Sequence, residues 1–483
     1  MGSPGSPLKV DLCVIGAGSA GLSATSFAAQ WGAKVVLVER AKMGGECLNM
    51  GCVPSKALLA AAKVAQAMRS AATFGITAVE PRVDFAAVQA YVQSVIATIA
   101  PHDSVERFEG LGATVIRGEA RFTGPRELAV ATDDGERRIS ARRVIIATGS
   151  SPAVPPVDGL ANVPFFTNEN LFDNTTLPEH LLILGGGPIG IEMAQAHRRL
   201  GSQVTVIESS ACLSKDDTAH ASLLLQRLAA EGIPVRQHTE VLSVRQDAGV
   251  IVLKLKEGGQ QSELRGSHLL VAAGRSPRTH ALALDRAGVQ VEKAGIVVDA
   301  KLRTNVRGVY AIGDVVAKAP HFTHIASYHA GIAVQNALLL PYAKTDYASL
   351  PWVTYCDPEL AHVGLSEADA RQQHGDDVKL LQFDLEGNDR AQTEAATLGG
   401  VKVWARENGT VLGVSILGAH AGEMAHLWGL AISSGLKLKA IASMIAPYPT
   451  FGEAGKAAAG ELYKPRLFGP LAKRVVRLMS HLP

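Results

Sequence analysis

Two glycine-rich turns with matching flanks constrain this chain more than any other feature of its sequence. The first follows the apolar run 10–15, and a helix-like stretch then leads to the apolar run 35–38, which ends in Glu39. The regularly placed glycines of this turn are Gly16, Gly18 and Gly21. In such a turn the first glycine allows a tight bend, the second admits a pyrophosphate close to the backbone, and the third lets the helix pack against the strand. The acidic residue is placed to hydrogen-bond a ribose hydroxyl, so the segment predicts a dinucleotide site.

The same unit occurs a second time. The apolar run 181–184 precedes the turn, and the run 204–207 ends in Glu208. The glycines of this turn are Gly185, Gly187 and Gly190. In both copies the acidic residue follows the first glycine by 23 positions. One glycine pattern of this kind can arise by chance, but a second copy with the same flanks and spacing argues against chance. The sequence therefore predicts an α/β protein that binds two dinucleotides, one of them a bound flavin.

The strands outside the two units indicate that the second unit is inserted into the first. A strand that ends in Thr148 and Gly149 precedes the second unit, a matching strand that ends in Gly274 follows it, and the run 309–314 returns to the first. Prolines between the units mark a boundary, and the pattern changes again near residue 351. The predicted parts are 8–155 and 277–350 for the first domain, 156–276 for the inserted domain, and 351–483 for a C-terminal domain.

A closely spaced cysteine pair, Cys47 and Cys52, follows the first turn. Residues five apart in a regular helix are roughly 8–9 Å apart at Cα, whereas a disulfide needs about 4.4–6.8 Å. A bond between them therefore requires an irregular turn, which Gly51 and Pro54 favour. The alternatives are two inert buried cysteines or half of a metal site, but further Cys or His ligands are not nearby. The pair is interpreted as redox-active, and no metal site is expected.

Composition excludes several other classes. Lys and Arg number 47 against 45 Asp and Glu, so the chain has no broad attraction to nucleic acid. Five cysteines in 483 residues are too few for a disulfide scaffold, which favours a cytoplasmic location.

The segment 464–481 has the pattern of a basic amphipathic helix, as at membrane surfaces. Such segments more often pack on their own protein, so membrane contact is not expected here.

With these motifs the chain resembles the class I pyridine nucleotide–disulfide oxidoreductases over residues 8–462. The segment GGECLNMGCVPSK at 44–56 is a specific signature of the branch that contains dihydrolipoamide dehydrogenase, glutathione reductase and mercuric reductase. Further matches are ATG at 147–149, GRSP at 274–277, AIGD at 311–314 and DPELAHVGLSE at 357–367. The resemblance implies a glutathione reductase-like fold with two Rossmann-like domains for FAD and NAD(P), and a C-terminal α+β domain that forms a homodimer.

The resemblance also implies roles for individual residues. Cys52 is expected to be the thiolate that faces the flavin, and Cys47 the thiol that exchanges with a disulfide or dithiol substrate. Lys56 is expected near the flavin, paired with Glu192 beside the nicotinamide, although both could be ordinary surface charges. Asp314 is expected to hold the FAD ribityl–phosphate region. The predicted cofactor-binding residues are Gly16, Gly18, Gly21, Glu39, Lys56, Thr148, Gly149 and Asp314 for FAD, and Gly185, Gly187, Gly190, Glu208 and Gly274 for the nicotinamide nucleotide.

The second nucleotide is predicted to be NAD rather than NADP. Glu208 can bond the ribose 2′-OH and repel a 2′-phosphate, and the serines that follow it supply no cation for that phosphate. Arg198 and Arg199 are the basic residues of this unit that could override the preference.

The chain departs from the family at the segment where a His-Pro-Thr motif normally supplies a base to the partner subunit. Tyr448 replaces the histidine, although Glu453 five residues later is kept. Mercuric reductases also have tyrosine here, but the chain lacks their C-terminal cysteine pair and their N-terminal CxxC domain. Histidines that could replace the base are His321, His324, His420 and His426.

The predicted function is that of an FAD-dependent NAD(P)H:disulfide oxidoreductase of the dihydrolipoamide dehydrogenase type. The alternatives are a mercuric-reductase-like metal reductase and a catalytically weak redox sensor that binds a partner. The sequence leaves open the physiological electron acceptor, the direction of the reaction and the role of Tyr448.

Overall fold

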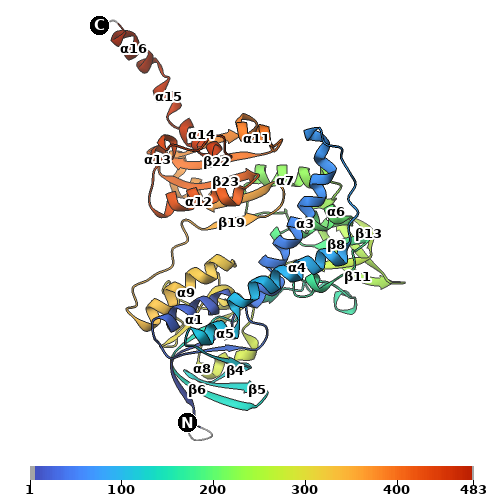
Figure 1. The fold of residues 1–483 in the computed structure, drawn as a ribbon, viewed down its shortest axis with the longest axis vertical. Coiled ribbons are helices and arrows are strands. Elements are labelled where there is room, and N and C mark those ends of the chain that lie inside the picture. Colours follow the sequence, from blue (N-terminus) through green and yellow to red (C-terminus); the bar gives the residue numbers. More distant parts are fainter. Residues whose placement is uncertain (1–5, 481–483) are drawn as a thin grey trace.

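The apolar run before the first glycine turn forms the central strand of a sheet in this computed structural model, which describes residues 6–480 (Figure 1). Strand β1 (Leu8–Ile15) runs parallel to β2 (Val35–Glu39) on one side and to β6 (Gly135–Ile146) on the other. Helices α1 (Ser19–Gln30) and α9 (Thr323–Leu338) pack together on one face. Every residue of β2 is buried, as expected for a parallel strand covered on both faces.

The first sheet is completed by segments from distant parts of the chain. Strand β18 (Val309–Ala311) pairs in parallel with the last residues of β6, so the chain does return to this sheet after the second unit. Strand β3 (Thr114–Arg117) pairs with β2 at one edge of the sheet. On the other side, β5 (Glu127–Thr132) pairs antiparallel with β6, and β4 (Glu119–Gly124) pairs antiparallel with β5. Helices α3 (Cys52–Ser70), α4 (Phe85–Ile99) and α5 (Val105–Gly110) lie between β2 and β3 in the chain.

The second unit forms its own parallel sheet, in the order β10-β9-β8-β14. Helix α6 (Pro188–Leu200) connects its two central strands, and an antiparallel three-stranded sheet precedes β14 in the chain. The elements are β8 (His180–Leu184), β9 (Gln203–Ile207), α7 (Thr218–Ala230), β10 (Val235–Arg236), β11 (Thr239–Asp247), β12 (Val250–Glu257), β13 (Gln260–Gly266) and β14 (His268–Val271). Short connecting elements are β7 (Ser150–Pro152), β15 (Arg275–Pro277), α8 (Leu284–Ala287), β16 (Val291–Glu292) and β17 (Gly295–Ile296).

The C-terminal part is an antiparallel five-stranded sheet in the order β19-β20-β23-β22-β21, with helices α12 and α14 packed on it. Its elements are β19 (Pro351–Thr354), β20 (Glu359–Gly364), α10 (Glu367–His374), β21 (Val378–Asp384), α11 (Asp389–Thr393), β22 (Gly400–Arg406), β23 (Val411–Gly418), α12 (Ala421–Ser433), α13 (Leu438–Ser443) and α14 (Glu453–Glu461). The predicted fold class, two Rossmann-like domains and an α+β domain, is confirmed. The residue limits set for each domain stay a prediction.

The prediction that the C-terminal segment packs on its own protein is wrong for the part that the structure describes. Helices α15 (Lys464–Leu467) and α16 (Pro470–Met479) project away from the body, and none of their residues is buried (Figure 1). Helix α15 contacts α14, and α16 contacts α15, so the chain continues away from the sheet after α14. His481, the last residue of the predicted segment, lies outside the described residues. Within 6–480, no helix combines the length and apolar character needed to cross a bilayer.

Candidate active site

The two glycine turns have the same geometry. The backbone N–H of Ala17 donates to Glu39 Oε2 at 2.6 Å, and the corresponding N–H of Gly186 donates to Glu208 Oε2 at 2.8 Å. Each acidic residue is thus fixed against its own glycine turn, at the end of the second strand, where a ribose is expected. The second unit therefore repeats the first in its side-chain contacts as well as in its sequence.

Backbone conformation and close backbone contacts require glycine at the first and third glycine positions of each turn. Gly16 and Gly185 have φ angles of +104° and +117°, which favour glycine. A Cβ on Gly21 would lie 1.7 Å from the carbonyl oxygen of Gly16, and a Cβ on Gly190 would lie 2.0 Å from that of Gly185. The third glycine of each turn therefore packs the helix on the strand, whereas Gly187 has no heavy atom within 4 Å of a built Cβ and faces open space.

One continuous cavity of about 2850 Å³ joins both turns to the cysteine pair. Single-ligand pockets usually span ~300–1,000 Å³, so this cavity has room for two dinucleotides. It is lined by all of the predicted cofactor residues except Gly21 and Gly190, which lie behind the turns. Backbone N–H groups at two helix N-termini and a carboxylate for each ribose fit FAD in the first unit and a nicotinamide nucleotide in the second.

The cysteine pair lies on a broken helix, as the spacing argument required. Helix α2 (Gly45–Met50) ends at Gly51, and α3 begins at Cys52. A Cβ on Gly51 would lie 3.2 Å from the Cα of Cys47, so glycine lets the two turns approach closely. Both thiols are free in the structure and both line the cavity. The hydroxyl of Thr323, at the start of α9, lies 3.3 Å from the Cys52 sulfur.

The two thiols differ in acidity. The adjacent Cys47 thiol, with help from Thr323 and the Lys56 ammonium, lowers the pKa of Cys52 to about 6, although burial opposes this. The same pairing with Cys52, together with burial, raises the pKa of Cys47. At neutral pH the reduced pair therefore holds one thiolate, on Cys52, and one proton, on Cys47.

Lys56 and Glu192 form an ion pair rather than two separate surface charges. Lys56 Nζ donates to Glu192 Oε2 at 2.8 Å, and the Glu192 side chain is only 5% exposed. Burial lowers the pKa of Lys56, but the Glu192 carboxylate outweighs burial, so the pKa is raised and the ammonium stays charged. The second Glu192 oxygen accepts the backbone N–H of Tyr355 at 2.9 Å, and Lys56 lies over the Tyr355 ring. Glu192, on α6 of the second unit, thus fixes the Lys56 ammonium, which lies on the same helix as Cys52.

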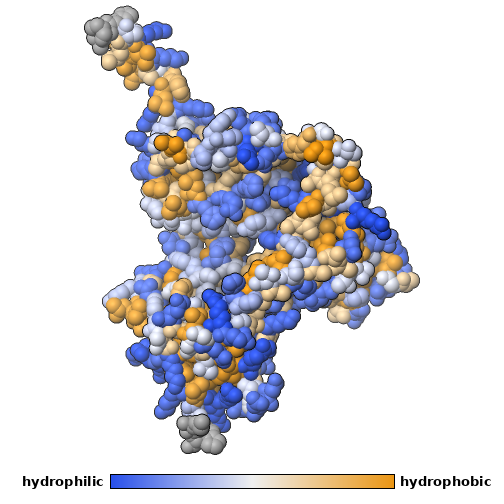
Figure 2. Space-filling view, viewed as in Figure 1, coloured by the Kyte–Doolittle hydropathy of each residue, from blue (hydrophilic) through white to orange (hydrophobic). Residues whose placement is uncertain are grey.

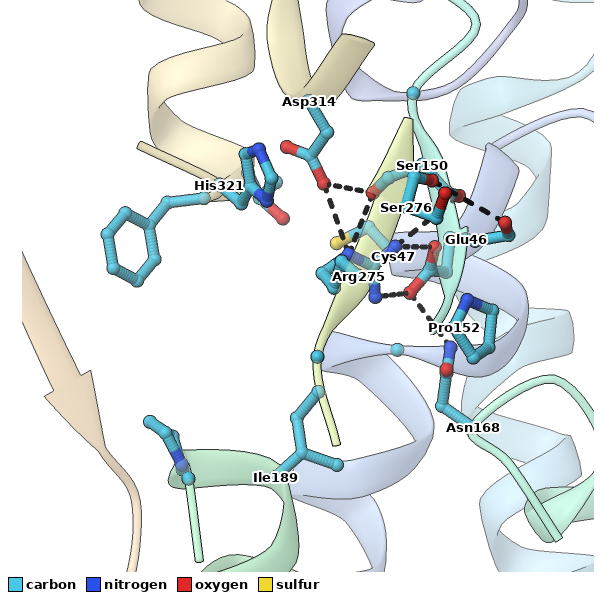
Figure 3. Close-up of a pocket in the computed structure, with 18 of the residues that line it drawn as sticks. Glu46, Cys47, Ser150, Pro152, Asn168, Ile189, Arg275, Ser276, Asp314 and His321 are labelled. Atoms are coloured by element: carbon cyan, nitrogen blue, oxygen red, sulfur yellow. Dashed lines mark hydrogen bonds and ion pairs between the residues drawn. The ribbon is translucent and has the colours of Figure 1, made fainter. Parts of the chain in front are cut away.

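A polar network beside Cys47 was not predicted from the sequence (Figure 3). Arg275 holds both oxygens of Glu46, one at 2.6 Å, and its Nε donates to Ser150 Oγ at 2.7 Å. Ser150 in turn donates to Asp314 Oδ2 at 2.7 Å, and Asn168 donates to Glu46. Glu46 and Arg275 are letters of the GGEC and GRSP motifs, so the signal was present, but only the structure shows that the two motifs meet. The network ties the residue before Cys47 to the predicted FAD ligand Asp314.

Tyr448 and Glu453 are not among the described residues that line this cavity. The Tyr448 side chain is exposed, at 71%, and its hydroxyl donates to Asp389 Oδ2 at 2.8 Å. This hydrogen bond raises the pKa of Tyr448 above its usual value. Glu453 accepts the backbone N–H of Thr450. Asp389 begins helix α11, so the structure joins two parts of the sequence that are 59 residues apart.

Three of the four candidate histidines, His321, His324 and His426, line the cavity, and His420 does not. His321 faces the cavity near Cys47 and Asp314 (Figure 3). His324 lies 2.9 Å from the carbonyl oxygen of Pro351, and burial lowers its pKa.

Comparison with known proteins agrees with this geometry. Residues 10–330 match the family described as pyridine nucleotide-disulphide oxidoreductase, and residues 350–459 match the dimerisation domain of that family. A mercuric reductase from Streptomyces lividans is 37% identical over 453 residues, which cover 93% of this chain and 95% of the relative. A dihydrolipoyl dehydrogenase from Thermus scotoductus is 38% identical over 466 residues, which cover 94% and 97%.

Solved structures give the same result. LpdA from Mycobacterium tuberculosis is similar with a TM-score of 0.85 and 26% identity over 94% of this chain and 100% of that chain. The HOCl-induced flavoprotein disulfide reductase RclA from Escherichia coli has a TM-score of 0.82 and 27% identity over 93% and 99%. Because a mercuric reductase and a dihydrolipoyl dehydrogenase are about equally similar to this chain, similarity alone leaves the substrate open.

Proposed function

This chain belongs to the pyridine nucleotide–disulphide oxidoreductase family and is an FAD-dependent NAD(P)H disulfide oxidoreductase, and we propose that it acts as an NADH-driven reductase rather than as a dihydrolipoamide dehydrogenase. The dimerisation domain indicates a homodimer. The carrying observation is the Tyr448–Asp389 hydrogen bond, which makes the residue at the usual position of the base a poor proton acceptor.

The proposal assigns the chemistry to residues of this chain as follows. Bound FAD supplies two-electron exchange between the nicotinamide and the Cys47–Cys52 disulfide. In the reduced pair, Cys47 attacks a substrate disulfide once its proton is removed, and one substrate thiol leaves. Cys52, already a thiolate near pH 7, then attacks the mixed disulfide, which restores the Cys47–Cys52 bond and releases the second thiol. The Lys56–Glu192 pair keeps positive charge beside that thiolate throughout.

The direction of the reaction determines what Tyr448 can do. Oxidation of dihydrolipoamide needs a base that removes a thiol proton, and an unperturbed phenol with pKa near 10 is almost wholly protonated at neutral pH. Reduction of a disulfide releases a thiolate, which a phenol that stays protonated can stabilise by donating a hydrogen bond. Tyr448 is exposed in the single chain. In a homodimer its side chain is therefore free to meet the partner's cysteine pair.

The test compares both directions with purified enzyme. NADH oxidation is measured with lipoamide, glutathione disulfide, mercuric ion, quinone and oxygen, and NAD⁺ reduction is measured with dihydrolipoamide. We expect at least one acceptor to support NADH oxidation faster than dihydrolipoamide reduces NAD⁺. Mercuric ion as the fastest acceptor would favour the metal-reductase alternative, for which Tyr448 is a specific point of similarity. Dihydrolipoamide as the fastest substrate would contradict the proposal.

We expect NADH to be preferred over NADPH by at least ~10-fold in kcat/KM, because Glu208 repels a 2′-phosphate. Burial opposes ionisation of Glu208, but hydrogen bonds from Gly186, Ser209 and Ser210 outweigh it and lower its pKa, so the carboxylate is charged. Neither arginine that could override this preference is free to do so: Arg199 is paired with Glu231, and Arg198 donates to the Glu231 carbonyl.

In steady-state kinetics, the Glu208→Gln variant should show a ratio of kcat/KM for NADH to kcat/KM for NADPH that is about tenfold smaller than that of the parent. Glu263→Gln is the matched control, because Glu263 lies on β13 of the same domain, pairs with Arg245, and does not line the cavity. A parent enzyme that prefers NADPH would refute this assignment.

A long-wavelength absorption band of the Cys52 thiolate beside oxidised flavin should appear on two-electron reduction and titrate with a midpoint near pH 6, the lowered pKa of Cys52. The band should be full above the midpoint and lost as pH falls below it, because the thiolate is the electron donor. In Lys56→Met the midpoint should move upward, since the ammonium helps to lower that pKa.

Lys63→Met, an exposed lysine on the same helix, is the control and should leave the midpoint unchanged. Equal midpoints in parent and Lys56→Met would exclude Lys56 as a cause of the low pKa.

A further inference from the structure

The C-terminal helix α16 has an apolar face that nothing in the described chain covers. Leu471, Val475, Leu478 and Met479 follow one another at intervals that place them on one side of a helix. They are 75%, 51%, 73% and 60% exposed. Figure 2 shows hydrophobic side chains gathered on the projecting tail, apart from the body. A contiguous exposed apolar surface outside a core commonly marks a binding site.

The opposite side of α16 is basic. Lys473, Arg474 and Arg477 share that side, and Lys464 and Arg466 precede it on α15. Residues 462–483 contain these five cations and no Asp or Glu, whereas the whole chain carries a net charge of +2. The rest of the chain is therefore slightly acidic, and the positive charge is concentrated beside the uncovered apolar face.

We propose that α16 binds the surface of a membrane that contains anionic lipids, with its axis in the plane of that surface. Ten residues are too few to span a bilayer, which needs about 20. A short helix with an apolar face and a Lys/Arg-rich face instead lies at the level of the headgroups, where both faces are satisfied. The helix projects from the body, so a flat surface can reach it without displacing the folded domains (Figure 1).

Charge decides between a membrane and a second copy of the chain. A second copy of this chain is only slightly acidic outside residues 462–483, whereas an anionic lipid surface presents a dense layer of negative charge. An anionic lipid surface uses both faces of α16, because acyl chains accept the apolar side chains and phosphates pair with the cations. The proposal does not rest on the electron acceptor proposed above, and it departs from the expectation that this segment makes no membrane contact.

The test is co-sedimentation of the full-length, FAD-containing enzyme with vesicles of phosphatidylcholine alone or mixed with phosphatidylglycerol. We expect at least ~10-fold tighter binding to the anionic vesicles, weakened by added salt. The triple variant Leu471→Gln/Val475→Gln/Leu478→Gln and the double variant Lys473→Gln/Arg474→Gln should each lose at least ~10-fold in affinity.

The matched control is Lys254→Gln/Lys256→Gln, which removes the same charge from exposed positions of β12. It should bind vesicles like the parent, and every variant should keep NADH oxidation with a soluble acceptor. A parent that stays in the supernatant with anionic vesicles, or tail variants that sediment as well as the parent, would overturn the proposal. So would sedimentation velocity showing that the triple variant, but not the parent, is monomeric, because the helix would then dock on the second subunit.

Discussion

The Cys47→Ser and Cys52→Ser variants are each expected to lose NADH-driven disulfide reduction by at least ~10³-fold while they keep bound FAD. Each exchange step needs a sulfur that can both attack and leave, and a serine hydroxyl does neither at neutral pH. The loss should be the same for either variant, because the two thiols act in one cycle. Initial rates with the better of the two disulfide acceptors, lipoamide or glutathione disulfide, together with the flavin absorbance of each variant, measure both parts of the prediction.

Cys13→Ala is the control for this pair. Cys13 lies fully buried in β1, and burial raises the pKa of its thiol to about 12, so it takes no part in exchange. Its loss should leave the rate within about threefold of the parent, since only packing changes. The single variants also test the roles of the two thiols, because the long-wavelength band should persist in Cys47→Ser and vanish in Cys52→Ser. The reverse pattern would exchange the two assignments.

Tyr448→His should increase NAD⁺-linked oxidation of dihydrolipoamide by about 10²–10⁴-fold, the range typical of an acid–base group. An unperturbed histidine titrates near pH 6.5, close to the working pH, whereas tyrosine titrates near 10. Asp389, which now accepts the Tyr448 hydrogen bond and raises the pKa of that phenol, is placed to orient an imidazole as well. The measurement is the rate of NADH formation from dihydrolipoamide by parent and variant enzymes.

Tyr448→Phe is the matched control, since it removes only the hydroxyl. We expect it to oxidise dihydrolipoamide as slowly as the parent. A parent that is fast in this direction and a phenylalanine variant that is slow would show that the phenol itself is the base.

The sequence predicted the fold because the motifs that define it are local. Each glycine turn lies within a single strand–turn–helix unit, so spacing alone indicates that Gly21 must pack against Gly16 and that Glu39 lies beside the turn. The pairing of β18 with the last residues of β6 was also predictable, since the apolar runs 144–146 and 309–312 each lead into a glycine. In each of these cases the residues that interact are either close in the chain or repeated in a recognisable pattern.

Contacts between distant motifs were not predictable in the same way. The Arg275–Glu46 pair joins residues 229 positions apart, and Tyr448 and Asp389 are 59 apart. In the sequence, each of these four residues looks like an ordinary charged or aromatic surface residue. Only the topology brings them together, and the exposure of α16 likewise appears only once the chain is folded.

The most direct test of the central claim is to count thiols before and after reduction by NADH. Oxidised enzyme is treated anaerobically with NADH, denatured, and labelled with a maleimide, and the labelled peptides are mapped. The account predicts two additional labels per chain, on Cys47 and Cys52, while Cys13, Cys212 and Cys356 are labelled equally in both samples. An unchanged number of labels, or new labels at any other cysteine, would contradict a Cys47–Cys52 disulfide that receives electrons from NADH.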